Sequence, residues 1–146
     1  MQIVRGGDNI LLQEVIERLN NLDVDVALST LRNYQKAQLI PNAVRVSLGR
    51  GKGTATEYPD EAYAEIYAAY MLLNGPIRTT PELLQEARGY ATSLLKDPYT
   101  DFPYDLITNT LCTLWLAYHE KARSGKDCFV AYHEGENGCK IQYVYI

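Results

Sequence analysis

Apolar residues recur at helical spacing over most of the chain. This spacing predicts helices over residues 9–21, 26–39, 59–75, 79–97 and 101–125. End signals agree with two of these helices, because Thr80 and Pro81 are typical of a helix start and Gly125 of a helix end. For the first helix, the expected N-cap is Asp8 or Asn9.

A different period, in which apolar and polar positions alternate, predicts two antiparallel hairpins. In the first, residues 44–48 form a strand whose valine and leucine side chains share a buried face, and residues 54–58 return after the glycine-rich turn at 49–53. The second hairpin fills residues 128–146 and reverses at the Gly-Glu-Asn-Gly sequence of 135–138. The expected fold class is therefore mainly α with small β-hairpins.

One candidate boundary divides the chain, at residues 74–81, where the sequence reads NGPIRTTP. Proline and glycine interrupt helical hydrogen bonding, so one helix should end and the next begin in this segment. We expect an N-terminal domain over residues 1–75. The remainder, residues 76–146, should form a C-terminal region of helices and a hairpin.

Positive charge is concentrated in one part of the chain. The formal net charge is −4, yet residues 29–56 contain five basic residues and no Asp or Glu, which leaves −9 for the remainder. Segregated charge of this kind indicates a partner more than it indicates a fold. A polyanion such as DNA is the partner that would make use of it.

Composition and motifs argue against several classes of protein. The chain is 47% apolar and 22% charged, which is ordinary for a soluble globular protein, and no segment approaches the roughly 18 apolar residues of a membrane span. The first ten residues lack the apolar core of a signal peptide, so we expect a cytoplasmic protein with no membrane partner. No catalytic motif is recognisable, so we expect neither an enzyme nor a cofactor.

The cysteine and histidine pattern does not predict a metal site. The chain has three cysteines and no Cys-x-x-Cys pair, and Cys128 and His133 would point to opposite faces of a regular strand. Cys112 and His119 fall on roughly the same face of a helix, but two ligands do not complete a tetrahedral site. The thiols are expected to be free or buried.

A family resemblance appears where the basic segment begins. STLRNYQKAQLIP at residues 29–41, followed by RVSLGRGKGTATEYPDEA at residues 45–62, resembles the DNA-binding half of MerR-family transcription regulators. The resemblance covers about residues 9–73. It implies a winged helix-turn-helix, in which one helix reads the major groove and a hairpin grips the DNA backbone. The matching positions are Thr30, Leu31, Arg32, Tyr34, Leu39, Ile40, Pro41, Arg45, Gly53 and Tyr58.

The sequence also departs from the family pattern. Asn33 stands where the family usually has a tyrosine, and Gln38 stands where a glycine would form the left-handed end of the reading helix. Ala27 replaces the usual serine N-cap, which leaves Asp25 as the expected cap. The long dimerisation helix of the family is cut short here by the Asn-Gly-Pro sequence at residues 74–76.

The candidate DNA-binding residues lie on one helix face and on the hairpin. Short or flexible polar side chains on the helix can reach base edges, and basic side chains on the glycine-rich hairpin can approach phosphates. Tyr58 resembles the wing-end tyrosine that contacts phosphate in the family, although it could instead fix the hairpin to the third helix. The expected set is Ser29, Thr30, Arg32, Asn33, Lys36, Arg45, Arg50, Lys52 and Tyr58.

These observations predict sequence-specific binding to double-stranded DNA, with transcriptional regulation as the expected role. An excisionase-like protein or a phage DNA-packaging adaptor would use the same winged helix. From a different class, a protein-interaction module would use the acidic, tyrosine-rich C-terminal half instead. That half is also a candidate site for a small-molecule or protein effector.

A homodimer is expected, because proteins that bind two-fold symmetric DNA sites are commonly dimers. The expected surface is the C-terminal hairpin together with an apolar helix stripe. The alternative is that this stripe forms the core of the C-terminal half, covered by the helix around residues 83–95. The stripe consists of Leu106, Leu111, Leu114, Trp115 and Tyr118.

Overall fold

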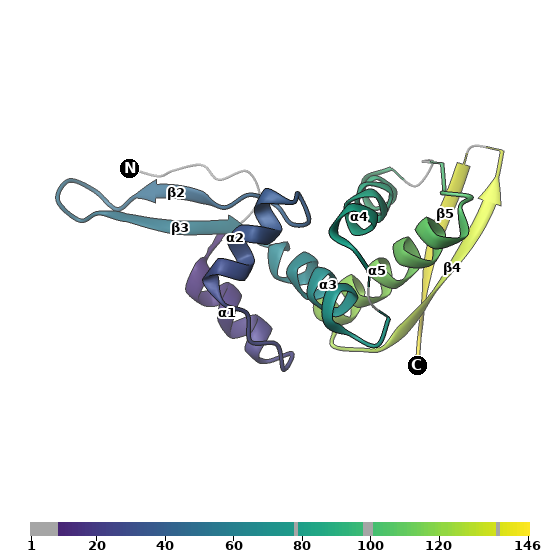
Figure 1. The fold of residues 1–146 in the computed structure, drawn as a ribbon, viewed down its shortest axis with the longest axis horizontal. Helices are drawn as coiled ribbons and strands as arrows, with labels where there is room; N and C mark the ends of the chain where they lie inside the picture. Colours follow the sequence, from purple (N-terminus) through teal and green to yellow (C-terminus); the bar gives the residue numbers. More distant parts are fainter. Residues whose placement is uncertain (1–8, 78, 98–100, 137) are drawn as a thin grey trace.

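The computed structural model describes residues 9–77, 79–97, 101–136 and 138–146. Over these residues the fold combines α-helices with two small antiparallel sheets, as the sequence pattern predicts (Figure 1). The elements in chain order are β1 (Asn9–Leu11), α1 (Leu12–Asn20), α2 (Leu28–Lys36), β2 (Val44–Ser47), β3 (Thr54–Pro59), α3 (Ala62–Asn74), α4 (Pro81–Lys96), α5 (Leu106–Ser124), β4 (Cys128–Gly135) and β5 (Gly138–Tyr145).

The start of the first predicted helix is a strand instead. Residues 9–11 form β1, which pairs antiparallel with β3 and places Ile10 opposite Tyr58. Both of these side chains are buried, so pairing against β3 removes their apolar surface from water. Helix α1 therefore begins at Leu12 without a side-chain cap, and the expected cap at Asn9 is wrong. Asp8 lies outside the described residues.

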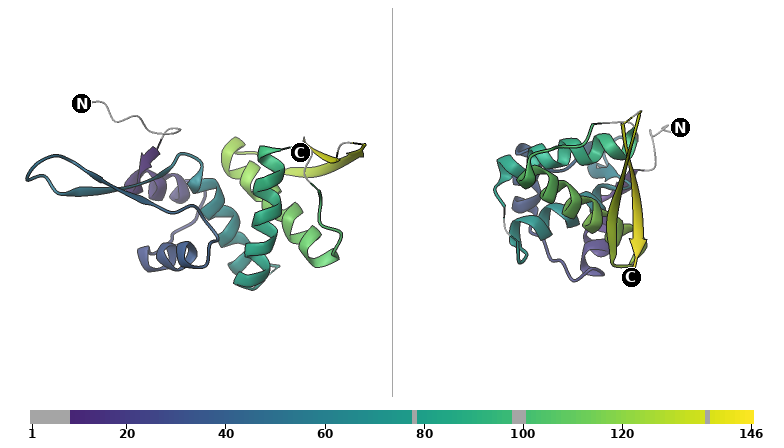
Figure 2. Two further views of the ribbon diagram at one scale, coloured as in Figure 1. Left: turned by 90° about the horizontal axis from the view of Figure 1, so that it is seen from above. Right: turned by 90° about the vertical axis from the view of Figure 1, so that its right-hand side faces the viewer.

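The first predicted hairpin forms, but it lacks the buried face that its alternating pattern suggested. Strands β2 and β3 pair in antiparallel register, and β2 lies at the edge of the three-stranded sheet. The hairpin projects away from the helices in two views of the molecule (Figures 1 and 2). Because the helices do not cover β2, Val44 and Leu48 remain about half exposed.

Helix α2 ends in a tight turn that the sequence predicted only in part. Gln38 adopts the left-handed conformation with φ of 59°, where the MerR-type pattern would have a glycine. The Leu39 backbone N–H donates to the Tyr34 carbonyl at 2.9 Å and closes the turn. From α4, the Arg88 guanidinium donates to the Gln38 carbonyl at 3.0 Å, so the turn is held by a distant helix. At the other end of α2 the expected cap at Asp25 is wrong, since Ala27 is the N-cap residue and makes no side-chain cap.

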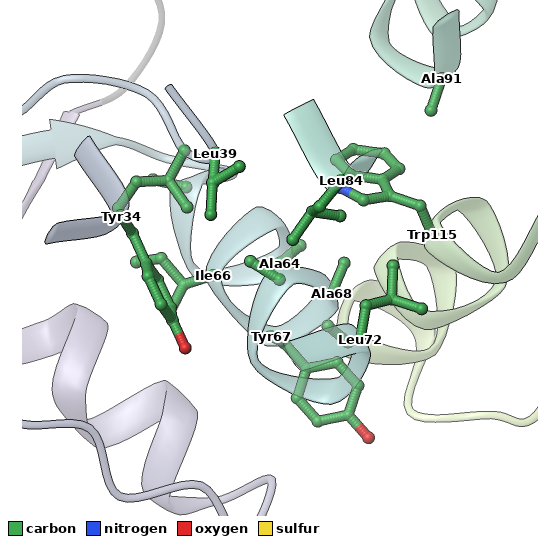
Figure 3. Packing of buried hydrophobic residues seen from close by; sticks show 14 of the residues in the cluster. Tyr34, Leu39, Ala64, Ile66, Tyr67, Ala68, Leu72, Leu84, Ala91 and Trp115 are labelled. Atoms are coloured by element: carbon green, nitrogen blue, oxygen red, sulfur yellow. The ribbon is translucent and has the colours of Figure 1, made fainter. Parts of the chain in front are cut away.

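Helix α3 is the centre of the core. It packs against α1 on one side and against α4 and α5 on the other, and Figure 3 shows its residues between Tyr34 and Trp115. Its alanines, including Ala64 and Ala68, are fully buried and let neighbouring helices approach closely. One apolar cluster therefore runs from Ile10 in β1 to Cys139 in β5, across the predicted boundary at residues 74–81.

The start of α4 and the end of α5 lie where local signals predicted, whereas α5 begins at Leu106, with Asp105 as its N-cap, rather than at residue 101. Thr80 caps α4 by accepting a hydrogen bond from the Leu83 N–H at 3.3 Å, and Gly125 ends α5 with a left-handed φ of 75°. Strands β4 and β5 pair along their whole length and pack against α5, where the Thr113 and Tyr132 hydroxyls lie 2.7 Å apart. Part of the predicted turn of this hairpin, Asn137, lies outside the described residues.

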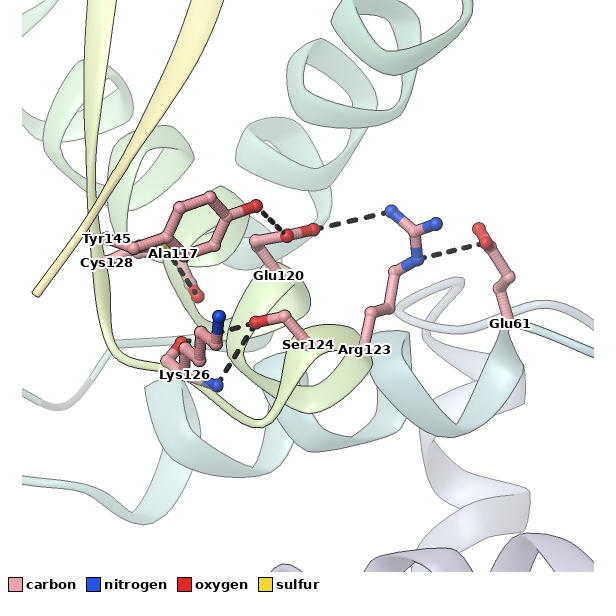
Figure 4. A network of polar contacts seen from close by, with 8 residues as sticks. All are labelled: Glu61, Ala117, Glu120, Arg123, Ser124, Lys126, Cys128 and Tyr145. Carbon is pink, nitrogen blue, oxygen red and sulfur yellow. Dashed lines mark hydrogen bonds and ion pairs between the residues drawn. The ribbon is translucent and has the colours of Figure 1, made fainter.

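A polar network fixes α5 to its neighbours (Figure 4). Arg123 at the end of α5 forms an ion pair with Glu61 at 3.1 Å, just before α3, and another with Glu120 at 3.4 Å. The Tyr145 hydroxyl of β5 donates a hydrogen bond to the carboxylate of Glu120. Glu120 is mostly buried, so these two partners offset the cost of removing its charge from water.

Candidate nucleic-acid interface

One face of α2 is exposed along its whole length. The exposed positions are spaced at i, i+1, i+4, i+5 and i+8, which is a continuous stripe on a helix. Leu31 and Tyr34 occupy the opposite face and are buried against the core. The stripe, called the α2 stripe below, consists of Leu28, Ser29, Arg32, Asn33 and Lys36.

The α2 stripe contains most of the helix residues expected to contact DNA. Ser29, Arg32, Asn33 and Lys36 are exposed on it together, whereas Thr30 lies at its edge and is half-buried. Leu28, whose apolar side chain would favour the buried face with Leu31 and Tyr34, is instead 49% exposed. Successive steps of three residues rotate by about 300° each on a helix, so Leu28 lies well away from the face of Tyr34.

The hairpin carries basic side chains on a glycine-rich tip. Arg50 and Lys52 are exposed in the turn between β2 and β3. Gly49, Gly51 and Gly53 in this turn have φ of 113°, 77° and 77°, values that favour glycine. Further down the hairpin, the Arg45 guanidinium donates to the Thr54 hydroxyl at 2.8 Å across the two strands, which holds the arginine against the exposed strand surface.

Carboxylates do not offset this positive charge on the hairpin. The only acidic residue between positions 44 and 59 is Glu57, and its side chain is buried, with 3% of its surface exposed. Asp60, just after β3, forms an ion pair with Arg18 of α1 at 3.2 Å. The exposed surface of the hairpin is therefore basic and neutral only, which suits an anionic partner.

The structure corrects the expected role of Tyr58. Its side chain is only 2% exposed, so it cannot lie against a DNA phosphate in this conformation. The Tyr58 hydroxyl accepts a hydrogen bond from the Gln35 amide at 2.7 Å, and burial raises the pKa of the phenol above its usual value. Tyr58 fixes the hairpin to α2 rather than contacting a ligand.

Gln35 is a positioning residue that the sequence patterns did not identify. Its amide nitrogen donates to Tyr58 in β3, and its carbonyl oxygen accepts from the Ala43 N–H at 3.1 Å, just before β2. The Gln35 side chain thus links α2 to β3 and to the residue that precedes β2. These two hydrogen bonds join the helix that carries the α2 stripe to the base of the hairpin.

The surface expected to form a dimer is only partly exposed. Leu111 and Trp115 are buried beneath neighbouring elements, as the alternative of a C-terminal core predicted. At the start of α5, Leu106 is 78% exposed and Ile107 is also exposed. These two side chains line an open groove of about 580 Å³ with Ile77 and Leu83. The exposed apolar surface of this region therefore lies at the start of α5, whereas the centre of the apolar stripe on α5 is buried.

The described residues contain no group of three or more potential metal ligands. Cys112 is fully buried on α5, and burial raises the pKa of its thiol to about 12, so the unreactive protonated form prevails. In β4 and β5, His133 lies opposite Lys140 and next to Gln142, to which its Nε2 is hydrogen-bonded at 2.8 Å. Among the described helices, none combines the length and apolar character that crossing a bilayer requires.

Comparison of the chain with protein-family models, with curated proteins and with solved structures found no match, so the assignment of function depends on the α2 stripe and the hairpin themselves.

Proposed function

We propose that this protein binds double-stranded DNA in a sequence-specific manner and acts as a transcriptional regulator. In this proposal residues 9–75 act as a MerR-like winged helix-turn-helix, with α2 as the reading helix and β2–β3 as the wing. The observation that carries it is the combination of two exposed surfaces without carboxylates, the α2 stripe and the projecting basic hairpin. Gln35 and Tyr58 hold these two surfaces in a fixed relation.

The two surfaces would divide the work of recognition. Asn33 and Lys36 present amide and ammonium groups that suit adenine and guanine in the major groove. Arg45, Arg50 and Lys52 present cations without a base-reading geometry, and each phosphate that they neutralise releases counterions. The helix would thus determine which sequence is bound, and the hairpin would supply affinity for any duplex.

Two other functions use parts of the same structure. An excisionase-like protein or a phage DNA-packaging adaptor would share the DNA contacts, and the positions of the bound sites in the genome would separate it from a regulator. A protein-interaction module would use the C-terminal hairpin, where Phe129 and Val144 form an exposed cross-strand pair. Such a module would not show salt-dependent binding to DNA.

Replacing Asn33 by alanine should cost roughly 1–3 kcal/mol of binding free energy on the preferred DNA sequence and little on other sequences. The reason is that an amide in bidentate contact with adenine contributes only when that base is present. Competition binding with a duplex selected from a random pool, against the same duplex scrambled, measures the difference. Asn20→Ala is the matched control, since Asn20 is exposed at the end of α1 outside the stripe. Equal losses on both duplexes would rule out base reading by Asn33.

The protein should also form a homodimer. A single winged helix covers roughly 600–1,000 Å² of DNA, which is marginal for specific binding, and pairing two copies is the usual remedy. The exposed apolar start of α5, with Leu106 and Ile107, and the outer face of the C-terminal hairpin are the surfaces available. Light scattering at micromolar concentration should give twice the chain mass of 16.5 kDa. A monomer both without and with DNA would contradict this prediction.

A further inference from the structure

Leu28 is the one apolar side chain of the α2 stripe. It is the first residue of α2, where it lies on the same exposed face as Arg32 and Lys36. An exposed leucine needs no explanation by itself, since much protein surface is apolar. The position of Leu28 at the start of α2 does need an explanation, because reading helices contact base edges mainly through residues at their N-terminal end.

The surroundings of Leu28 leave its side chain accessible to a ligand. It borders an open groove whose lining includes Leu11 at the end of β1, Leu12 and Glu17 of α1, and Ala55 and Thr56 of β3. Leu11 is also about half exposed, so this groove continues the apolar surface around Leu28 rather than covering it. Leu28 therefore lies at the start of the α2 stripe and shares a groove with β3 of the hairpin, where a bound duplex would pass in the proposed function.

The major groove offers few groups that a leucine can recognise. Base edges present hydrogen-bond donors and acceptors, and the apolar exception is the 5-methyl group of thymine. A 5-methylcytosine presents the same methyl group at the same place on the ring. Burial of a methyl group against Leu28 would favour a pyrimidine with that group over one without it.

We propose that Leu28 determines sequence preference by contacting the 5-methyl group of a pyrimidine in the major groove of the bound DNA. This inference rests on the proposed function, because it requires α2 to be the reading helix. It adds a recognition element that the polar residues of the α2 stripe do not supply. It also commits to a definite feature of the DNA site, which is a thymine, or a 5-methylcytosine, opposite the first turn of α2.

The experiment compares thymine with deoxyuridine, which pairs in the same way but lacks the methyl group. The preferred duplex is first selected from a random pool with the wild-type protein, and each thymine is then replaced singly by deoxyuridine. At one thymine of each half-site the affinity of the wild type should fall about fourfold, the equivalent of one buried methyl group. Replacing the sensitive thymine–adenine pair by a 5-methylcytosine–guanine pair should then bind more tightly than the unmethylated cytosine pair.

Variants of Leu28 test whether this residue makes the contact. Leu28→Ala should bind the thymine and deoxyuridine duplexes equally, and Leu28→Met, which keeps a long apolar side chain, should retain the difference. Leu48→Ala is the matched control, because Leu48 is 51% exposed on the hairpin and should not face a base methyl group. Each variant is compared by thermal melting to establish that it is folded.

The outcomes separate this inference from the proposed function. Salt-dependent binding to DNA with no thymine sensitive to loss of its methyl group would overturn the role of Leu28 and leave the DNA-binding proposal standing. Sensitivity that persists in Leu28→Ala, or that disappears in Leu48→Ala instead, would assign the contact to another residue and also overturn it. Absence of salt-dependent DNA binding would contradict both the role of Leu28 and the proposal that the protein binds DNA.

Discussion

Replacing Arg50 and Lys52 together by alanine should weaken binding to duplex DNA roughly 100-fold at about 0.1 M salt, whatever the sequence of the duplex. Both side chains are exposed on the glycine-rich tip of the hairpin, where the backbone can approach phosphates closely. Each lost phosphate contact removes roughly tenfold in affinity at this salt concentration and lowers the slope of log K against log [salt] by about one. Titrations of the variant over a range of salt concentrations measure both quantities.

The matched control removes the same charge elsewhere on the protein. Lys126→Ala with Lys140→Ala also removes two positive charges, but from the C-terminal half, where Lys126 lies in the loop before β4 and Lys140 lies in β5, both exposed. This control should leave the salt slope unchanged, because a general change in net charge releases no additional bound counterions. If the control weakened binding as much as the hairpin variant, the wing assignment would be wrong. If the hairpin variant altered which sequence is preferred, the roles of helix and wing would be reversed.

His119 should make the stability of the protein depend strongly on pH. Its imidazole is 2% exposed on α5 and stacks on Trp115 with ring centroids 4.8 Å apart. Its buried Nδ1 makes no hydrogen bond to any described residue. Burial, together with the nearby charge of Arg123, lowers the pKa of His119 from 6.5 to about 4.

The direction of the effect follows from the two protonation equilibria. In the unfolded chain His119 takes up a proton as the pH falls through 6.5, whereas the folded protein resists protonation until about pH 4. The free energy of unfolding should therefore be greatest above pH 6.5 and should lose about 3 kcal/mol between there and pH 4 through this residue. Urea denaturation at a series of pH values measures the loss.

The chain has only two histidines, so each can be removed in turn. His119→Phe keeps a ring against Trp115 but cannot take up a proton, and the wild-type protein should lose more stability than this variant on acidification. His133→Gln is the control, because it removes the other histidine, which is exposed on the C-terminal hairpin. A wild type and a His119→Phe variant with the same pH dependence would show that His119 is not buried as the structure has it.

Local signals predicted much of the fold because they act through neighbouring residues. The Thr80 cap and the left-handed Gly125 depend on a few adjacent backbone groups, and both occur where the sequence placed them. The strand at residues 9–11 could not be predicted in this way, because it depends on pairing with β3, about fifty residues away. Its apolar residues match a helical pattern equally well, and only the tertiary partner decides between the two.

The candidate site shows the same division between local and distant effects. The polar spacing of Ser29, Asn33 and Lys36 is a property of one helix, and the structure exposes all three residues together. Tyr58 is different, because the hydrogen bond from Gln35 that fixes it joins α2 to β3. The apolar character of Leu28 favours the buried face of α2, yet its angle around the helix places it on the exposed face. Neither position could be settled before the packing of α2 was known.

The measurement that tests DNA binding most directly is a fluorescence-anisotropy titration of the wild-type protein on a labelled duplex of mixed sequence. Performed at several salt concentrations, it should show binding whose log K falls with log [salt] with a slope of about −3 or steeper, the contribution expected of three hairpin cations. These cations are Arg45, Arg50 and Lys52. Absence of binding at low salt, or an affinity that does not change with salt, would contradict DNA recognition and would favour a protein-interaction role for the C-terminal hairpin.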